Sequence, residues 1–150
     1  KYETPTICDP VTIYADSELL QNVEILTGDY QQTLSKAKGI SFFYFDPPYR
    51  PLSNTSSFND YSKEAFNDLA QQRLKIFCDK VTDAGYKFML SNSDCFNTPL
   101  KDTFFEDLYL AYTIDRVWAT RMVNANPNKR GKLQEILVHN YTETKLKQAV

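Results

Sequence analysis

The chain has 150 residues, 42% of them hydrophobic and 24% charged, and its formal net charge is −2. These values fit one ordinary globular domain and give no global attraction to nucleic acid or acidic membranes, so any site for a polyanion has to be local. The sequence contains no apolar run of about eighteen residues and opens on no signal-peptide pattern, so we expect no membrane contact.

Signals for regular structure follow one another near the start of the chain. Asp9 is a suitable helix N-cap and Pro10 fits the first helical position, so we expect a helix over residues 10–21. The elements expected next are a short buried strand at 23–26, a turn at 27–30 and a short helix at 31–37.

The stretch SFFYFDPPY at residues 41–49 joins a continuous apolar run to a carboxylate, two prolines and a tyrosine. Because the run does not alternate with polar residues, it predicts a parallel strand that is covered on both faces. The residues that follow, up to about 62, are rich in proline, serine and asparagine and predict a long exposed loop.

The second half of the chain begins with a strongly periodic helix. Asn67 is its expected N-cap, Gly85 its expected end, and its apolar side is predicted to hold Leu69, Leu74, Phe77, Cys78 and Val81. The elements expected after it are a strand at 86–91, a polar ending at 92–94, a helix from Thr98 to about Glu106, and two strands at 108–117 and 133–141.

This order of elements predicts an α/β sheet whose first strands are parallel and whose last pair is antiparallel. Ligands of such sheets bind at the carboxyl ends of the strands. Three polar endings are therefore expected to converge at one edge, at residues 28–30, 46–49 and 91–94.

The DPPY segment has the residue types needed to activate an exocyclic amine. The lone pair of such an amine is delocalised into the ring, and two acceptors around the amino hydrogens would localise it. Asp46 and the carbonyl of Pro47 can be these acceptors, since Pro47 and Pro48 fix the backbone and carry no N–H. Tyr49 offers a face on which an extruded base can stack. A rigid turn that ends the strand is the alternative interpretation.

Other polar features each allow a structural and a functional interpretation. Residues 116–134 carry five basic side chains and no acidic one, which is typical of a loop that binds phosphates but also of a solvated hairpin. His139 is the only histidine, and we expect a structural role for it. Cys8, Cys78 and Cys95 form no CxxC pair, so we expect free thiols and no metal site.

Four strings together resemble one known family. DPPYRPLSNTSSFNDY, the upstream ILTGDY, the downstream FMLSNSD and the segment RMVNANPNKRGKLQEILVHNY are similar to the Dam-like adenine-N6 DNA methyltransferases, over most of residues 23–141. The resemblance implies a Rossmann-like sheet, S-adenosylmethionine as cofactor, double-stranded DNA as substrate, and a cytoplasmic bacterial or phage enzyme of DNA methylation or restriction-modification.

The resemblance also implies roles for individual residues. Catalysis would fall to Asp46, Pro47, Pro48 and Tyr49. The cofactor would be contacted by Asp29, Tyr30 and Asp46. DNA would be contacted by residues of two loops, namely Ser53, Asn54, Arg121, Asn124, Asn126, Lys129 and Arg130.

One feature of that family is not found in the sequence. Its glycine-rich FxGxG turn, which holds the methionine end of the cofactor, has no counterpart among Gly28, Gly39, Gly85 and Gly131. We therefore expect one domain that is the C-terminal part of a catalytic domain, with residues 1–10 as the tail of a target-recognition region. Its cofactor pocket would be incomplete, it would bind cofactor weakly and be inactive alone, and an exposed sheet edge would favour a homodimer.

Two other functions remain open at this stage. The acceptor could be another amino group, such as cytosine N4 or an RNA base. Alternatively, the chain could be a noncatalytic DNA-binding module that keeps an inactive site.

Overall fold

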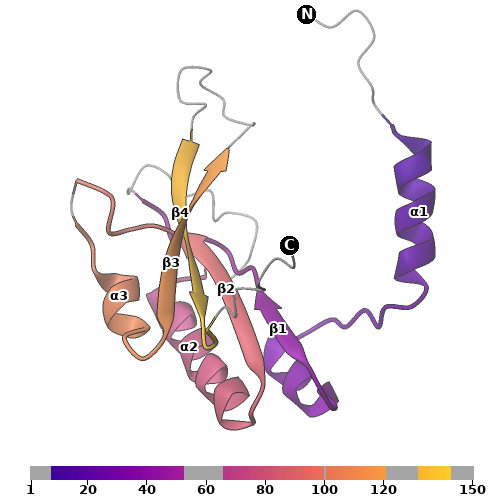
Figure 1. Cartoon of the computed structure of the whole chain (residues 1–150), viewed down its shortest axis with the longest axis horizontal. Coiled ribbons are helices and arrows are strands. Elements are labelled where there is room, and N and C mark those ends of the chain that lie inside the picture. Colours follow the sequence, from indigo (N-terminus) through magenta and orange to yellow (C-terminus); the bar gives the residue numbers. More distant parts are fainter. Residues whose placement is uncertain (1–7, 53–65, 100, 121–131, 143–150) are drawn as a thin grey trace, which may run out of the picture. The chain divides into compact units, whose positions relative to one another are not determined.

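The computed structural model describes residues 8–52, 66–99, 101–120 and 132–142 (Figure 1). The chain divides into two compact units, Lys1–Gln32 and Thr33–Val150, and each is described here by itself.

The first unit contains helix α1 (Pro10–Leu20), which begins as expected. Asp9 accepts hydrogen bonds from the main-chain N–H groups of Val11 and Thr12 at 3.2 and 3.3 Å, and Pro10 occupies the first turn. These bonds satisfy donors that a helix start otherwise leaves without partners.

The buried strand expected at residues 23–26 is wrong. These residues form no strand, and Ile25 is 77% exposed. A short apolar run becomes a strand only when a neighbouring strand pairs with its main chain, and in the described part of the chain none does. The turn expected at residues 27–30 is confirmed. Gly28 has a φ of 124°, and Asp29 accepts a hydrogen bond from the N–H of Gln31 at 2.9 Å. The short helix expected next is the 3₁₀ helix η1 (Tyr30–Lys36).

The second unit is built on one four-stranded mixed sheet, with strand order β1-β2-β4-β3 among the described residues (Figure 1). Its strands are β1 (Phe42–Phe45), β2 (Lys87–Ser93), β3 (Thr113–Thr120) and β4 (Lys132–His139). β1 and β2 are parallel, whereas β4 runs antiparallel to both β2 and β3. The expected α/β class, the parallel start and the terminal antiparallel pair are confirmed.

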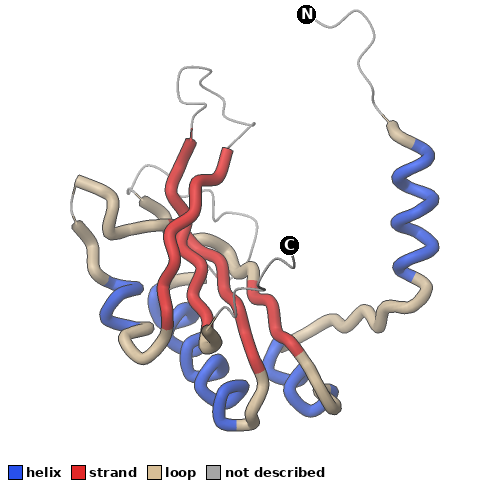
Figure 2. Tube along the Cα trace, in the orientation of Figure 1, coloured by secondary structure: helices blue, strands red, loops and turns tan. Residues whose placement is uncertain are grey.

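Helix α2 (Asp68–Asp83) lies against β2 (Figure 2). Its apolar side is buried. The side chain of Asn67 caps it, and Gly85, with a φ of 81°, follows its end, as expected. Phe77 is buried and packs edge-on against Phe45, with ring centroids 5.8 Å apart. The apolar side differs from expectation at two positions, because Leu69 is 72% exposed and Gln71 is fully buried. Leu69 lies in the first turn of α2 on the opposite side from Gln71 and Leu74, which are buried.

Strand β1 is covered on one face rather than on both. Phe43 and Phe45 face α2, but Phe42 and Tyr44 are 55% and 58% exposed. β1 has one strand neighbour, β2, and therefore forms an edge of the described sheet. The pairing is parallel as predicted. The expectation that both faces of the strand are covered is wrong, because one face of β1 is exposed.

The helix expected from Thr98 begins later, as α3 (Phe104–Leu108). Its start is fixed by Asp102, whose Oδ1 accepts a hydrogen bond from the N–H of Phe104 at 3.0 Å. β3 likewise begins at Thr113 rather than at residue 108, because Leu108 still belongs to α3 and a turn follows it.

Candidate active site

Asp46 and Ser91 lie side by side where the parallel pairing of β1 and β2 ends. Asp46 follows the last residue of β1, and Ser91 comes one residue after Leu90, the register partner of Phe45. The hydroxyl of Ser91 donates a hydrogen bond to Oδ1 of Asp46 at 2.9 Å, and the hydroxyl of Tyr44 donates to Ser91 at 3.3 Å. Asp46 is exposed, and in the described part of the chain its Oδ2 accepts no hydrogen bond. Ser91 thus orients one carboxylate oxygen, and the other has no donor among the described residues.

The main chain after Asp46 is held by two amide side chains. The carbonyl of Pro48 accepts a hydrogen bond from Nε2 of Gln71 at 3.2 Å, and the N–H of Arg50 donates to Oδ1 of Asn92 at 2.9 Å. Among the described residues, none donates a hydrogen bond to the carbonyl of Pro47. A second acceptor therefore lies next to Asp46 without an internal partner.

Tyr49 is partly buried, and its hydroxyl donates a hydrogen bond to Oε2 of Glu135 on β4 at 3.3 Å. Burial raises the pKa of the Tyr49 phenol, and the nearby carboxylates of Glu135 and Asp46 raise it further. The phenol therefore stays neutral to more alkaline pH than an ordinary tyrosine, and the bond to Glu135 restrains the orientation of the ring.

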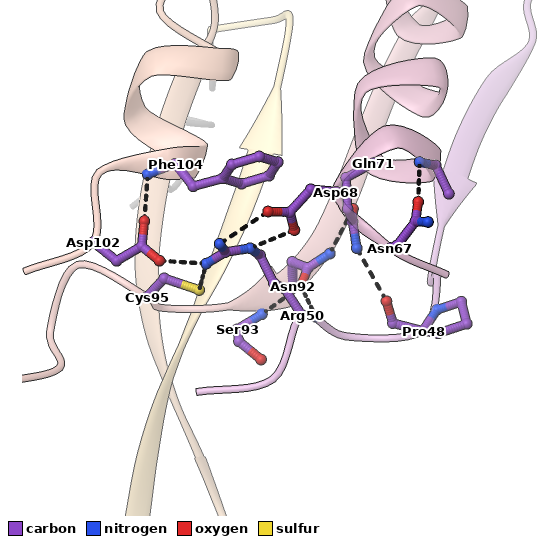
Figure 3. A network of polar contacts seen from close by, with 11 residues as sticks. Pro48, Arg50, Asn67, Asp68, Gln71, Asn92, Ser93, Cys95, Asp102 and Phe104 are labelled. Atoms are coloured by element: carbon purple, nitrogen blue, oxygen red, sulfur yellow. Dashed lines mark hydrogen bonds and ion pairs between the residues drawn. The ribbon is translucent and has the colours of Figure 1, made fainter. Parts of the chain in front are cut away.

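Arg50 lies at the centre of a polar network that the sequence did not predict (Figure 3). Its guanidinium makes two hydrogen bonds to Asp68, at 2.8 and 3.1 Å, and a third to Asp102. It also lies 4.4 Å from the ring centroid of Phe104. The Asp68 carboxylate holds the pKa of the guanidinium above its usual value, and Arg50 in turn lowers the pKa of Asp102.

Gln71 is the other residue missed from sequence, and it bonds to Asn92, which belongs to the polar ending at 91–94 that was expected to converge with residues 46–49. Both are fully buried, and Nδ2 of Asn92 donates to Oε1 of Gln71 at 3.3 Å. The available signal was the spacing of Gln71 with Leu74 and Cys78, which puts a polar residue on the apolar side of α2. A buried polar side chain in such a position needs hydrogen-bond partners.

Other predicted site residues are not brought to this site by the described structure. Asp29 and Tyr30 belong to the first unit, so their predicted proximity to Asp46 stays a prediction. The predicted DNA-contacting residues Ser53, Asn54, Arg121, Asn124, Asn126, Lys129 and Arg130 lie outside the described residues.

Arg116 and His139 are both bonded to other residues of the sheet region. Arg116, from the segment interpreted as phosphate-binding, forms ion pairs with Asp94, at 3.0 Å, and with Glu106, so it is not a free cation. Nε2 of His139 lies 2.9 Å from Oδ2 of Asp115, and its other ring nitrogen lies 2.7 Å from the carbonyl oxygen of Tyr141. The expected structural role of His139 agrees with these contacts.

The described residues contain no cluster of side chains that could hold a metal ion, and Cys8, Cys78 and Cys95 are free thiols. Within the same residues, no helix has both the length and the apolar character needed to cross a membrane.

Similarity to known proteins agrees with the arrangement of this site. Residues 1–123 match the family described as D12 class N6 adenine-specific DNA methyltransferase. The type II methyltransferase M.MjaIII of Methanocaldococcus jannaschii is 43% identical over 142 residues, which cover 94% of this chain and 47% of that protein. The type II methyltransferase M1.LlaDCHI of Lactococcus lactis subsp. cremoris is 39% identical over 143 residues, covering 94% and 48%. A DNA adenine methylase of Vibrio cholerae is 30% identical over 122 residues, covering 81% and 42%.

The chain spans about half the length of these curated relatives. The match to the family itself extends over most of the chain and includes the strand that carries Asp46. The chain belongs to the D12 class N6 adenine-specific DNA methyltransferase family.

Proposed function

We propose that the protein containing this chain transfers a methyl group to N6 of adenine in double-stranded DNA, and that Asp46, Pro47, Pro48 and Tyr49 bind the reacting base. The observation that carries the proposal is the arrangement at the end of β1. There, Ser91 orients an exposed carboxylate next to a main-chain carbonyl that has no donor among the described residues. Family membership supports adenine as the acceptor.

Asp46 and Pro47 act on the amino group through its two hydrogens. One hydrogen is donated to Oδ2 of Asp46 and the other to the carbonyl oxygen of Pro47. The nitrogen then becomes more tetrahedral, and its lone pair turns out of the ring plane toward the incoming methyl group. Because both acceptors are fixed before the base arrives, they stabilise the developing positive charge without reorganising. The amino proton leaves after methyl transfer, and the carboxylate of Asp46, which already accepts a hydrogen bond from the amino group in this proposal, can receive it.

Tyr49 supplies the stacking surface for an extruded adenine. Aromatic stacking contributes about 1–3 kcal/mol per base, which offsets part of the cost of taking the base out of the helix. Its hydroxyl is bonded to Glu135, so the ring presents a restrained face. A phenol is uncharged at neutral pH and does not repel the phosphates of DNA, and the raised pKa of Tyr49 extends this neutral range to more alkaline pH.

S-adenosylmethionine is the methyl donor in this proposal, and when bound it supplies an electrophilic methyl group on its sulfonium. Asp29, Tyr30 and Asp46 are the residues proposed to contact it. The exposed carboxylate of Asp46 fits a cationic donor, and Asp29 is exposed at the turn that begins η1. The residues proposed to contact DNA, namely Ser53, Asn54, Arg121, Asn124, Asn126, Lys129 and Arg130, lie outside the described residues.

We also propose self-association of the chain along β1. Its exposed face carries Phe42 and Tyr44, and its outer edge lacks a strand partner among the described residues. Such an edge pairs readily with a second strand, and a copy of the same chain offers the same apolar surface.

The proposed function is tested by identifying the methylated product. The full-length protein would be incubated with labelled S-adenosylmethionine and either duplex DNA or RNA, and the digested nucleosides would be separated. Label in N6-methyladenine from DNA is the expected result. Label in N4-methylcytosine, or label in RNA alone, would assign another acceptor, and DNA binding without any transfer would indicate a noncatalytic module.

A further inference from the structure

The segment that carries the DPPY residues has very few main-chain donors of its own. Residues 47–51 read PPYRP, so Tyr49 and Arg50 are the two residues of this stretch with a main-chain N–H. A segment with so few donors cannot be fixed by a strand ladder, and groups from neighbouring elements have to hold it. The question is which side chains do so.

Two buried amides hold the main chain of this segment (Figure 3). Gln71, from α2, donates to the carbonyl of Pro48, and Asn92, from β2, accepts from the N–H of Arg50. The two amides are hydrogen-bonded to each other, and Asn92 also accepts from the N–H of Ser93. Neither amide can rotate without losing a partner, so the position of residues 48–50 is tied to α2 and β2.

The side chain of Arg50 adds a third attachment. Its guanidinium bonds Asp68 at the start of α2 and Asp102 just before α3, and it lies over the ring of Phe104. Its side chain is 19% exposed, so these contacts are partly shielded from water. A planar guanidinium can make the two-pronged bond to Asp68 and the bond to Asp102 at the same time, whereas a lysine ammonium cannot reproduce that geometry.

We propose that Arg50 is a positioning residue for methyl transfer, because it fixes the DPPY segment so that Asp46 and the carbonyl of Pro47 meet the amino group of the base. This inference rests on the proposed function. Arg50 is four residues from Asp46, and the prolines between and after them restrict φ, so a displacement at Arg50 is passed along the segment. A shift of about 1 Å in reacting groups can lower a rate roughly 100-fold.

The kinetic test compares Arg50→Met and Arg50→Lys with wild type in the full-length protein. The matched control is Lys75→Met, which removes the ion pair between Lys75 and Asp79 within α2. That ion pair has the same length, 2.8 Å, as the one between Arg50 and Asp68. We expect Arg50→Met to lower kcat about 100-fold, with little change in KM for DNA or cofactor. The kcat of Arg50→Lys should lie between those of Arg50→Met and wild type, because lysine keeps the charge but cannot make the two-pronged bond to Asp68. The kcat of Lys75→Met should match that of wild type.

A second readout does not depend on methyl transfer. The amide hydrogen of residue 50 is bonded to Asn92, so its exchange rate with solvent, measured by NMR on this chain, reports whether the segment is held. We expect slow exchange in wild type and in Lys75→Met, and faster exchange in Arg50→Met. If Arg50→Met does not fold, Arg50→Lys is compared in the same way, with a smaller increase expected.

The possible outcomes separate the two proposals. Unchanged kcat and unchanged exchange in a folded Arg50→Met protein would overturn the positioning role, as would a loss of activity that appears only in KM or in thermal stability. A wild-type protein that transfers no methyl group to adenine would contradict the proposed function. In that case, the exchange rates still decide whether Arg50 holds the segment.

Discussion

The hydroxyl oxygen of Ser91 lies 2.9 Å from Oδ1 of Asp46, at the point where the parallel pairing of β1 and β2 ends. The serine is buried in the sheet, whereas the carboxylate is exposed beyond it. This single hydrogen bond sets the direction of the carboxylate, and it relates a structural residue of β2 to the proposed chemistry of the segment after β1.

Ser91→Ala should therefore slow methyl transfer without preventing folding. A hydrogen bond to a charged group contributes about 1.5–3 kcal/mol, and about 1.4 kcal/mol corresponds to tenfold in rate, so we expect kcat to fall roughly tenfold to 100-fold. The matched control is Ser41→Ala, because Ser41 precedes β1 and its hydroxyl bonds only to Lys38 among the described residues. Equal kcat for the two variants would show that Ser91 does not orient Asp46.

Tyr49 gives a prediction that separates its ring from its hydroxyl. Tyr49→Phe keeps the stacking surface and loses the bond to Glu135, so its KM for DNA should stay near that of wild type. Tyr49→Ala removes the ring, and the loss of about 1–3 kcal/mol of stacking should raise KM for DNA roughly tenfold. Steady-state kinetics of both variants provide the measurement. The same effect in Tyr49→Phe and Tyr49→Ala would assign the role to the hydroxyl instead of the ring.

The Arg50–Asp102 pair predicts a dependence of stability on pH. The hydrogen bond from Arg50 lowers the pKa of Asp102 in the folded chain, so the folded state favours the ionised carboxylate. The resulting stabilisation is complete above the pKa of Asp102 in the unfolded chain, which is about 4. It is lost as the pH falls through the lower pKa that Asp102 has in the folded chain.

The free energy of unfolding should therefore be higher for wild type than for Asp102→Asn at pH 7, and this difference should shrink as the pH is lowered below about 4. Denaturant titrations at several pH values measure it. Asp83→Asn is the control, since it removes the same charge from an exposed residue at the end of α2. A difference that stays constant from pH 7 to about pH 3 would contradict the coupling.

The contact between α2 and the sheet predicts a large effect of truncating Phe77. Its ring is buried between Phe43 and Phe45, and replacing it by alanine should cost about 3–5 kcal/mol of the free energy of unfolding. Ile76 precedes it on the same helix but is exposed, so Ile76→Ala should change stability by no more than about 0.5 kcal/mol. Urea unfolding of the two variants tests this packing, and similar losses in both would contradict it.

The edge formed by β1 predicts self-association that depends on its apolar face. At high concentration the chain should scatter light as a dimer, and Phe42→Lys should shift it toward monomer because a charge at a sheet edge disfavours pairing. Leu110→Lys changes another exposed apolar residue, which lies between α3 and β3, and should leave the dimer intact. A wild-type chain that remains monomeric would rule out the dimer.

Features that depend on neighbouring residues in the chain could be predicted from the sequence. Asp9 and Asn67 cap their helices through bonds to residues no more than three positions away, so the local pattern was sufficient. The strand before Asp46 and its parallel pairing could also be inferred, because the apolar run and the alternation of elements both indicate it. The family resemblance then pointed to the DPPY residues.

Features that depend on distant partners could not be predicted. The run at 23–26 has the composition of a strand, but strand formation requires a neighbour, and composition does not reveal one. Arg50 could be seen in the sequence, but its partners Asp68 and Asp102 are 18 and 52 positions away. These partners can be recognised only once the packing of α2 and α3 is known. Gln71 is similar, since its role depends on Asn92 in a different element.

The central claim is that Asp46 activates the amino group of adenine, and the most direct measurement is the single-turnover rate of methyl transfer by Asp46→Ala. The full-length variant and wild type would both be saturated with duplex DNA and labelled cofactor, so that binding does not limit the rate. We predict that Asp46→Ala forms N6-methyladenine at least about 100-fold more slowly than wild type. Formation of N6-methyladenine at the wild-type rate by Asp46→Ala would contradict the claim.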